Sequence, residues 1–178
     1  MMNNDNITLT FSDYINADSA KAFVEKLVVA NEKKPDSNLL TVFISSAGGD
    51  IDVAIELYNF IRSLDCRVKM VNTSYVNSAA VIVFLAGDDR VCLHNSSFYV
   101  HSVSKKLNGN YNVTELMREV KEMKTNTDKI AELLAETTKK NMAYWKQMMR
   151  KGFIITAKKS VELGLSDKTE RPNKENRK

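Results

Sequence analysis

The sequence predicts an α/β domain with a mainly parallel sheet. Over the first two-thirds of the chain, short apolar runs typical of strands alternate with segments whose apolar residues recur at helical spacing. The chain has 178 residues, which is enough for one domain with a sizeable core and too few for two ordinary domains. An alternation of this kind builds parallel strands joined by right-handed crossovers.

Each element has its own signal along the chain. Residues 7–11 alternate between apolar and polar, as a half-buried strand does, and residues 23–28 have apolar side chains at helical spacing. Asn16 and Asp18 are both candidate N-caps for that first helix. Further strands are predicted at 39–45, 66–72, 90–93 and 97–101, and further helices at 53–64 and 78–85.

The pattern changes after residue 101. A polar loop at 105–111 is followed by a long amphipathic stripe over 113–134, which exceeds about five helical turns. A helix of this length is longer than a small domain needs, so we expect it to project and to pack against another subunit. The charged tail, 168–178, contains Pro172 and no other apolar residue, and we expect it to be disordered.

Composition excludes several classes of function. The net charge is +4 without a basic–aromatic motif of the nucleic-acid type, and no apolar run approaches the length of a membrane span. Residues 1–6 are polar and do not resemble a signal peptide. Cys66 and Cys92 lie in strand-like runs, so we expect buried free thiols and a reducing, cytoplasmic location. No metal-ligand cluster is present, and no cofactor is expected.

Two turns rich in small residues each follow a predicted buried strand. The first, 45–50 (SSAGGD), follows the strand at 39–45, and the second, 74–81 (SYVNSAAV), follows the strand at 66–72. Because parallel strands end at the same edge of a sheet, the glycine amides and the isolated Ser78 are expected to meet there. Glycine N–H groups can bind an oxyanion and a serine can attack a carbonyl, which indicates an acyl-transfer site.

Four segments together resemble the Clp protease proteolytic subunit (ClpP) family of serine peptidases, over about residues 7–167. They are 45–49 (SSAGG), 76–80 (VNSAA), 93–101 (LHNSSFYVH) and 154–167 (IITAKKSVELGLSD), which are similar in order and spacing to the family's oxyanion turn, nucleophile elbow, histidine segment and carboxy-terminal stretch. The resemblance implies one domain over 1–167, with a crotonase-like head at about 7–104 and 135–167. It also implies a helical handle at about 105–134.

The resemblance also implies roles for individual residues. Ser78 would be the nucleophile, and His101 would be the general base and later the general acid. Gly49 and Ala79 would supply the two oxyanion N–H groups, and Gly48 would lie against the substrate. His94 occupies a position where the family has proline and is interpreted as a loop residue.

The third member of the family's catalytic triad is missing. The aspartate aligns with Gly152, and no Asp or Glu lies between Glu136 and Glu162. His101 would therefore be oriented by a substitute, namely water, a backbone carbonyl, Asn141 or a carboxylate from elsewhere, or else activity would be weakened or lost. If the local geometry is like the family's, Gly152→Asp is expected to raise activity.

Three functions are compatible with the sequence. The leading one is a self-compartmentalising serine endopeptidase, a ring-type homo-oligomer of one or two stacked rings, which cleaves peptides or unfolded proteins. An ATP-driven (AAA+) unfoldase partner is conceivable but is not expected, because few residues precede Ile7. The second function is an inactive assembly or scaffold subunit, which the missing aspartate favours. The third is a crotonase-type acyl-CoA enzyme, which does not need a serine followed by a histidine.

Overall fold

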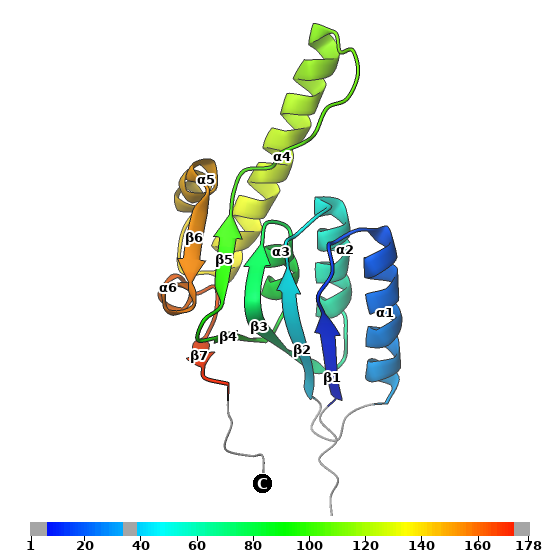
Figure 1. Cartoon of the computed structure of the whole chain (residues 1–178), viewed down its shortest axis with the longest axis vertical. Helices are drawn as coiled ribbons and strands as arrows, with labels where there is room; N and C mark the ends of the chain where they lie inside the picture. The colour runs from blue at the N-terminus through cyan, green and yellow to red at the C-terminus, as the bar shows by residue number, and fades with distance from the viewer. Residues whose placement is uncertain (1–6, 34–38, 173–178) are drawn as a thin grey trace, which may run out of the picture.

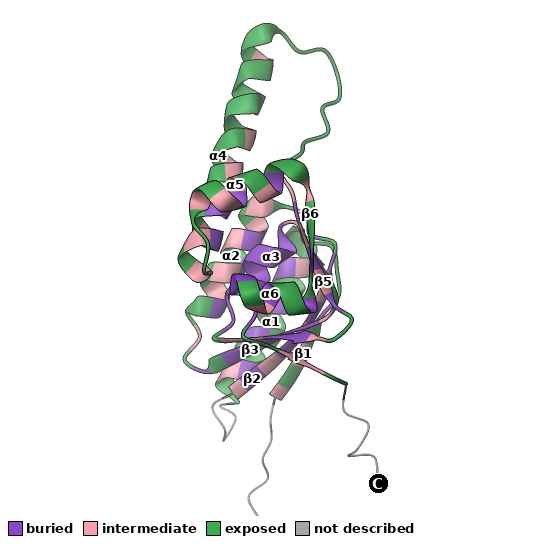
Figure 2. Ribbon diagram, turned by 90° about the vertical axis from the view of Figure 1, so that its left-hand side faces the viewer, coloured by how far each residue is buried: buried purple, intermediate pink, exposed green. Residues whose placement is uncertain are grey.

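The computed structural model describes residues 7–33 and 39–172 of the chain. A seven-stranded sheet is covered on one face by helices that pack successively against one another (Figures 1 and 2). The predicted α/β fold with a mainly parallel sheet is confirmed. Residues 1–6, on which the unfoldase expectation depends, lie outside the described residues.

The sheet has a parallel main path and a short antiparallel extension. The main path runs in the order β1 (Ile7–Phe11), β2 (Leu39–Ser46), β3 (Arg67–Asn77), β4 (Asp89–Leu93) and β7 (Lys168–Glu170). β3 is longer than predicted and serves two partners: residues 69–72 pair with β4, and residues 75–77 pair with β5 (Ser97–Val100). β6 (Phe153–Thr156) then pairs antiparallel with β5. The far end of β3 thus lies directly beside β5.

Local capping fixes where the first helices begin. The helices are α1 (Ala17–Glu32), α2 (Ile51–Arg62), α3 (Ala80–Leu85), α4 (Val113–Thr137), α5 (Met142–Lys151) and α6 (Ala157–Leu163). Asn16, rather than Asp18, caps α1 and forms a reciprocal capping box with Ser19. Asp50 caps α2, since its carboxylate accepts from the N–H groups of Asp52 and Val53.

The core is centred on α3, all six residues of which are buried (Figure 2). Phe84 of α3 packs edge-to-face on Phe98 of β5, with ring centroids 5.1 Å apart. Burying a side chain of this size stabilises the fold by about 1.5–3 kcal/mol. This packing keeps β5 in place against the turn that leads from β3 into α3.

Both cysteines are buried and free, as predicted. Burial raises the pKa of the Cys66 thiol, and nearby carboxylates, led by Asp88, raise it further. A thiol with a raised pKa is protonated at neutral pH and is a poor nucleophile.

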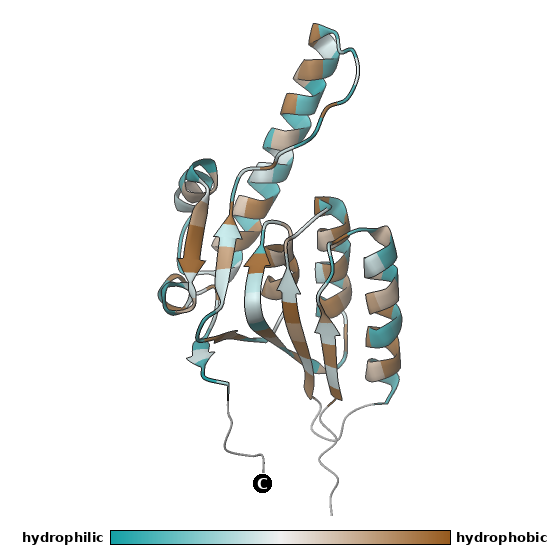
Figure 3. Cartoon of the chain, viewed as in Figure 1, coloured by the Kyte–Doolittle hydropathy of each residue, from teal (hydrophilic) through white to brown (hydrophobic). Residues whose placement is uncertain are grey.

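Helix α4 projects from the body of the molecule, as the sequence predicts (Figure 1). Its last turns pack on the head, where Ile130 and Leu134 are buried, whereas Val113 and Met117 near its start are 70% and 68% exposed. Apolar residues recur along the projecting part (Figure 3). No helix in the described residues is both long and apolar enough to cross a membrane.

The carboxy-terminal tail differs from the expectation. Lys168–Glu170 forms β7, with Lys168 opposite Val91 of β4, so the prediction of disorder from residue 168 is wrong for this segment. The reason is that backbone pairing with a sheet edge holds a polar strand that shows no hydrophobic pattern. Glu170 also forms ion pairs with Lys69 and Lys168. Residues 173–178 lie outside the described residues.

Candidate active site

Ser78 lies in a sharp turn between a strand and a helix. β3 ends at Asn77 and α3 begins at Ala80, and Ser78 has a φ of +54°. Among the described residues, Ser78 is the only one other than glycine with a positive φ. Such a backbone conformation costs about 1–3 kcal/mol and persists only where its surroundings impose it. Here the Ser78 N–H donates to the carbonyl of Tyr99 at 2.8 Å, which ties the turn to β5.

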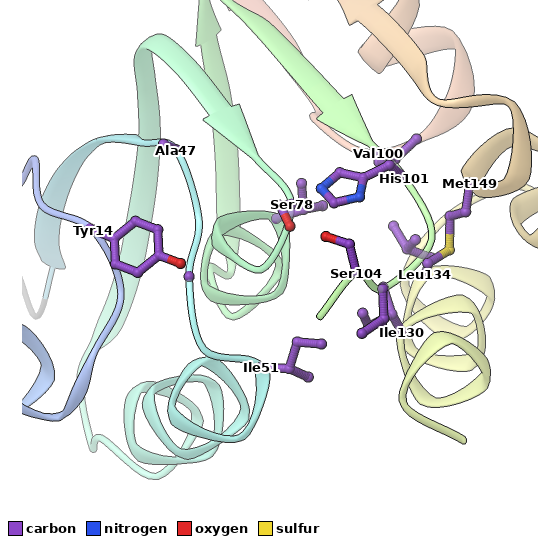
Figure 4. A pocket seen from close by; sticks show the side chains of 13 residues that line it. Tyr14, Ala47, Ile51, Ser78, Val100, His101, Ser104, Ile130, Leu134 and Met149 are labelled. Carbon is purple, nitrogen blue, oxygen red and sulfur yellow. The ribbon is translucent and has the colours of Figure 1, made fainter. Parts of the chain in front are cut away.

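The same strand pairing brings His101 to Ser78. In the parallel register of β3 and β5, Asn77 lies opposite Tyr99, so the chain leaves β5 for His101 just where β3 turns at Ser78. Ser78 and His101 line one cavity of about 230 Å³. The serine hydroxyl and the imidazole lie beside each other at this cavity (Figure 4).

The glycine turn after β2 approaches two other segments too closely for a side chain. A Cβ at Gly49, whose φ is +151°, would lie 2.1 Å from the carbonyl oxygen of Ile15. A Cβ at Gly48 would lie 2.6 Å from the carbonyl oxygen of Asn77 and 2.8 Å from the Cβ of Ser78. Only backbone fits at these positions, so the turn is packed directly against the serine.

Two N–H groups near Ser78 are candidates for an oxyanion hole. Gly49 lines the same cavity as Ser78, and Ala79 follows Ser78 in the chain and is buried. Among the hydrogen bonds of residues 7–33 and 39–172, neither N–H donates to a protein acceptor. Backbone N–H groups left without a protein partner can donate to the negative oxygen of a tetrahedral intermediate.

A backbone carbonyl lies where His101 needs an orienting acceptor. The imidazole Nδ1 of His101 is 2.7 Å from the carbonyl oxygen of Ser102. A carbonyl can only accept, so Nδ1 carries the proton and Nε2 is left to accept one. The Ser102 N–H in turn donates to the carbonyl of Met149 at 2.9 Å, which fixes this segment against the end of α5. Asn141, another candidate for the orienting role, instead caps α5.

Gly152 lies against Tyr99, and the tyrosine hydroxyl occupies the place of a side chain at position 152. Val100 and Phe153 are the last register pair of β5 and β6, and His101 and Gly152 each lie one residue beyond that pair. Gly152 has a φ of +66°, and a Cβ there would lie 2.8 Å from the hydroxyl oxygen of Tyr99. An aspartate at this position would be strained and crowded. Because of this geometry, Gly152→Asp alone is no longer expected to raise activity.

Several cavity residues carry no signal in the sequence. The hydroxyl groups of Tyr14 and Ser104 face the cavity in Figure 4, and Ser104, three residues after His101, could have been suspected from its position. The apolar wall comes from elements distant in sequence, and only the fold brings these residues to Ser78. It includes Ile51, Val103, Ile130, Leu134 and Met149.

The chain is similar to known proteins over most of its length. A sequence model of the Clp protease family matches residues 1–172 of the chain. The protein belongs to the Clp protease family. Curated relatives within this family include an ATP-dependent Clp protease proteolytic subunit of Paracoccus denitrificans, 24% identical over 80% of this chain and 70% of the relative. A proteolytic subunit 2 of Treponema denticola is 28% identical over 90% of this chain and 80% of the relative.

The fold of this Clp protease family member is similar to that of a solved relative. The structure of a ClpP1 point mutant from Listeria monocytogenes superimposes with a TM-score of 0.82, covering 93% of this chain and 92% of that one. The two sequences are 21% identical, so this similarity concerns the fold. The family membership supports a peptidase.

Proposed function

We propose that this Clp protease family member is a serine peptidase that cleaves peptides or unfolded proteins through an acyl-enzyme on Ser78. The observation that favours this function most is the strained φ of +54° at Ser78, in a turn that presents the hydroxyl beside His101. Strain at a single polar residue in a cavity is the expected mark of a functional position. A serine with a purely structural role would not need a strained backbone conformation.

The reaction follows from the positions of the groups. His101 Nε2 takes the Ser78 hydroxyl proton as Oγ bonds to the carbonyl carbon of the substrate. The carbonyl oxygen becomes an oxyanion and accepts from the N–H groups of Gly49 and Ala79. His101 then gives the proton to the leaving amine, the C–N bond breaks, and water releases the acyl group by the reverse sequence.

The Ser102 carbonyl is a weaker partner for His101 than a carboxylate. It is neutral, so it stabilises the imidazolium less than an aspartate would. Replacing the triad aspartate by asparagine in a serine protease costs about 10⁴ in turnover, largely because the imidazole adopts the wrong tautomer. A carbonyl imposes the right tautomer, since it accepts only. We therefore expect a loss of less than about 10⁴ relative to a complete triad.

The cavity favours an apolar substrate side chain. Its wall beside Ser78 is formed by Ile51, Val103, Ile130, Leu134 and Met149. A cavity of about 230 Å³ has room for a side chain rather than for a whole ligand, since small-molecule pockets usually measure about 300–1,000 Å³. Cleavage after an apolar residue is therefore part of the proposal.

The proposal includes a ring-type homo-oligomer. The projecting part of α4 exposes Val113, Leu116, Met117 and Val120 along one stripe. An apolar stripe of this length on an extended helix needs a partner surface. A second copy of the chain is the partner proposed here, with α4 contributing contacts between stacked rings. The curated relatives are likewise named proteolytic subunits.

An inactive scaffold subunit is the second candidate. It is favoured by one observation, the glycine at position 152 where the family pattern has a carboxylate. In that case the fold and the assembly would persist while Ser78 would not react.

The test of the proposed function is hydrolysis of a short fluorogenic peptide with an apolar residue before the scissile bond. Ser78→Ala should abolish hydrolysis while fold and assembly persist. Ser78→Gly should be equally inactive but more stable, since glycine adopts a positive φ without strain. Hydrolysis by Ser78→Ala at the wild-type rate would refute the assignment, and a wild-type protein without activity would favour the scaffold.

A further inference from the structure

The side chain of Tyr99 lies against the imidazole of His101. The two residues are two positions apart at the end of β5, so both side chains leave the same face of the sheet. Their rings stack with centroids 5.1 Å apart and an angle of 26° between the planes. A stacked neighbour limits the rotation of the imidazole about its side-chain bonds.

The tyrosine hydroxyl also fills the space that a side chain at position 152 would need. The Cβ position at Gly152 lies 2.8 Å from the Tyr99 hydroxyl oxygen and 3.6 Å from two of its ring carbons. Gly152 and His101 each lie one residue beyond the last register pair of the two strands, Val100 and Phe153. The missing carboxylate and the tyrosine are therefore two parts of one packing arrangement beside the imidazole.

We propose that Tyr99 is a positioning residue for His101 and supplies part of the orientation that a carboxylate at position 152 would provide. The proposal rests on the serine peptidase function proposed above. The Ser102 carbonyl holds Nδ1, and the Tyr99 ring fixes the plane of the imidazole, so that Nε2 is directed to Ser78. The electron-rich face of the tyrosine also stabilises the positive charge that His101 gains during attack.

The first arm of the test measures the rate at which a fluorophosphonate probe acylates Ser78. Tyr99→Leu removes the ring and should slow acylation about tenfold, whereas Tyr99→Phe keeps the ring and should stay close to wild type. Tyr75→Leu is the matched control, because Tyr75 is a tyrosine on the same face of the sheet as Tyr99. It lies on β3, is 43% exposed, and pairs with Ser97, which is two positions before Tyr99 on β5. This control should react at the wild-type rate. If Tyr99→Leu does not fold, Tyr99→Met, which also lacks a ring, replaces it.

The second arm needs no activity. The chain has two histidines, so with histidine labelled at the imidazole Cε1 the spectrum contains two such signals, and His94→Gln assigns them. The stacked ring should shift the resonance frequency of the His101 Cε1 signal. Tyr99→Phe should retain this shift, and Tyr99→Leu should lose it. An unreactive wild type would refute the peptidase function while this arm still tests the position of the imidazole.

Three results would overturn the role of Tyr99. One is acylation of Tyr99→Leu at the wild-type rate. Another is an unchanged His101 signal in that variant. The third is equal slowing of the Phe and Leu variants, which would assign the effect to the hydroxyl group and not to the stacked ring.

Discussion

The imidazole Nδ1 of His101 lies 2.7 Å from the carbonyl oxygen of Ser102, the next residue in the chain. The orienting acceptor is thus supplied by the local backbone instead of by a distant side chain. Its position depends on the path of the segment after His101, which Lys105 ties to α4 through ion pairs with Glu119 and Glu122. The segment that carries the orienting carbonyl is therefore linked to the projecting part of α4.

The first prediction concerns the two histidines. His101→Gln should lower the rate of Ser78 acylation by about 10²–10⁴, the usual contribution of a general base. His94 is exposed in the turn between β4 and β5, so His94→Gln should leave the rate unchanged. Stopped-flow measurement with a fluorescent fluorophosphonate probe compares the two. Equal rates for both variants would remove His101 from the mechanism.

The second prediction concerns the close approach of the glycine turn. Gly49 and Gly109 both have positive φ, but a Cβ at Gly49 would meet Ile15 whereas one at Gly109 would meet nothing within 4 Å. Both alanine variants carry backbone strain, and Gly49→Ala should lose about 1–3 kcal/mol more unfolding free energy because of overpacking. Urea denaturation measures the difference. Similar losses for both would mean that the turn does not lie against Ile15.

The third prediction revises the engineering of position 152. Gly152→Asp alone should cost about 1–3 kcal/mol of unfolding free energy and should not accelerate acylation, because of its positive φ and the Tyr99 hydroxyl. Tyr99→Ala frees that space. In this background, Gly152→Asp should raise the rate of Ser78 acylation about tenfold over Tyr99→Ala alone, a part of the roughly 10⁴ that a triad carboxylate contributes to turnover. A faster single variant would show that the tyrosine does not obstruct the site.

The fourth prediction concerns assembly through α4. Met117→Glu places a charge in the exposed apolar stripe and should reduce the molar mass of the assembly measured by light scattering. Arg118→Glu makes a larger change of charge one position along, about 100° around the helix, and should have less effect. Stability of the monomer should not change, since both residues are exposed. An undiminished mass for Met117→Glu would exclude this stripe from the interface.

The fold could be predicted because its signals are local. Each signal involves residues close together in sequence: the alternation at 7–11, the capping residue Asn16 and the apolar run of α3. β7 could not be predicted, because its polar residues are held by backbone pairing with β4 and by ion pairs. The length of β3 was also missed, since its second half continues past the apolar run to pair with β5.

The candidate site was predictable in part. The sequence indicated Ser78, His101 and Gly49 by their motifs, and the structure brings all three to one cavity. The role proposed for Tyr99 depends on ring stacking with His101 and on the space beside Gly152, and neither can be inferred from the spacing of residues in the sequence. The Ser102 carbonyl could not be predicted as the partner of His101 either, because every residue has a backbone carbonyl.

The most direct test that Ser78 is the nucleophile is the mass of the intact protein after treatment with a fluorophosphonate probe. A single adduct per chain is expected, located on Ser78 by peptide mapping, absent from Ser78→Ala and strongly slowed in His101→Gln. A folded wild-type chain that stays unmodified, or an adduct on a residue other than Ser78, would refute this role of Ser78.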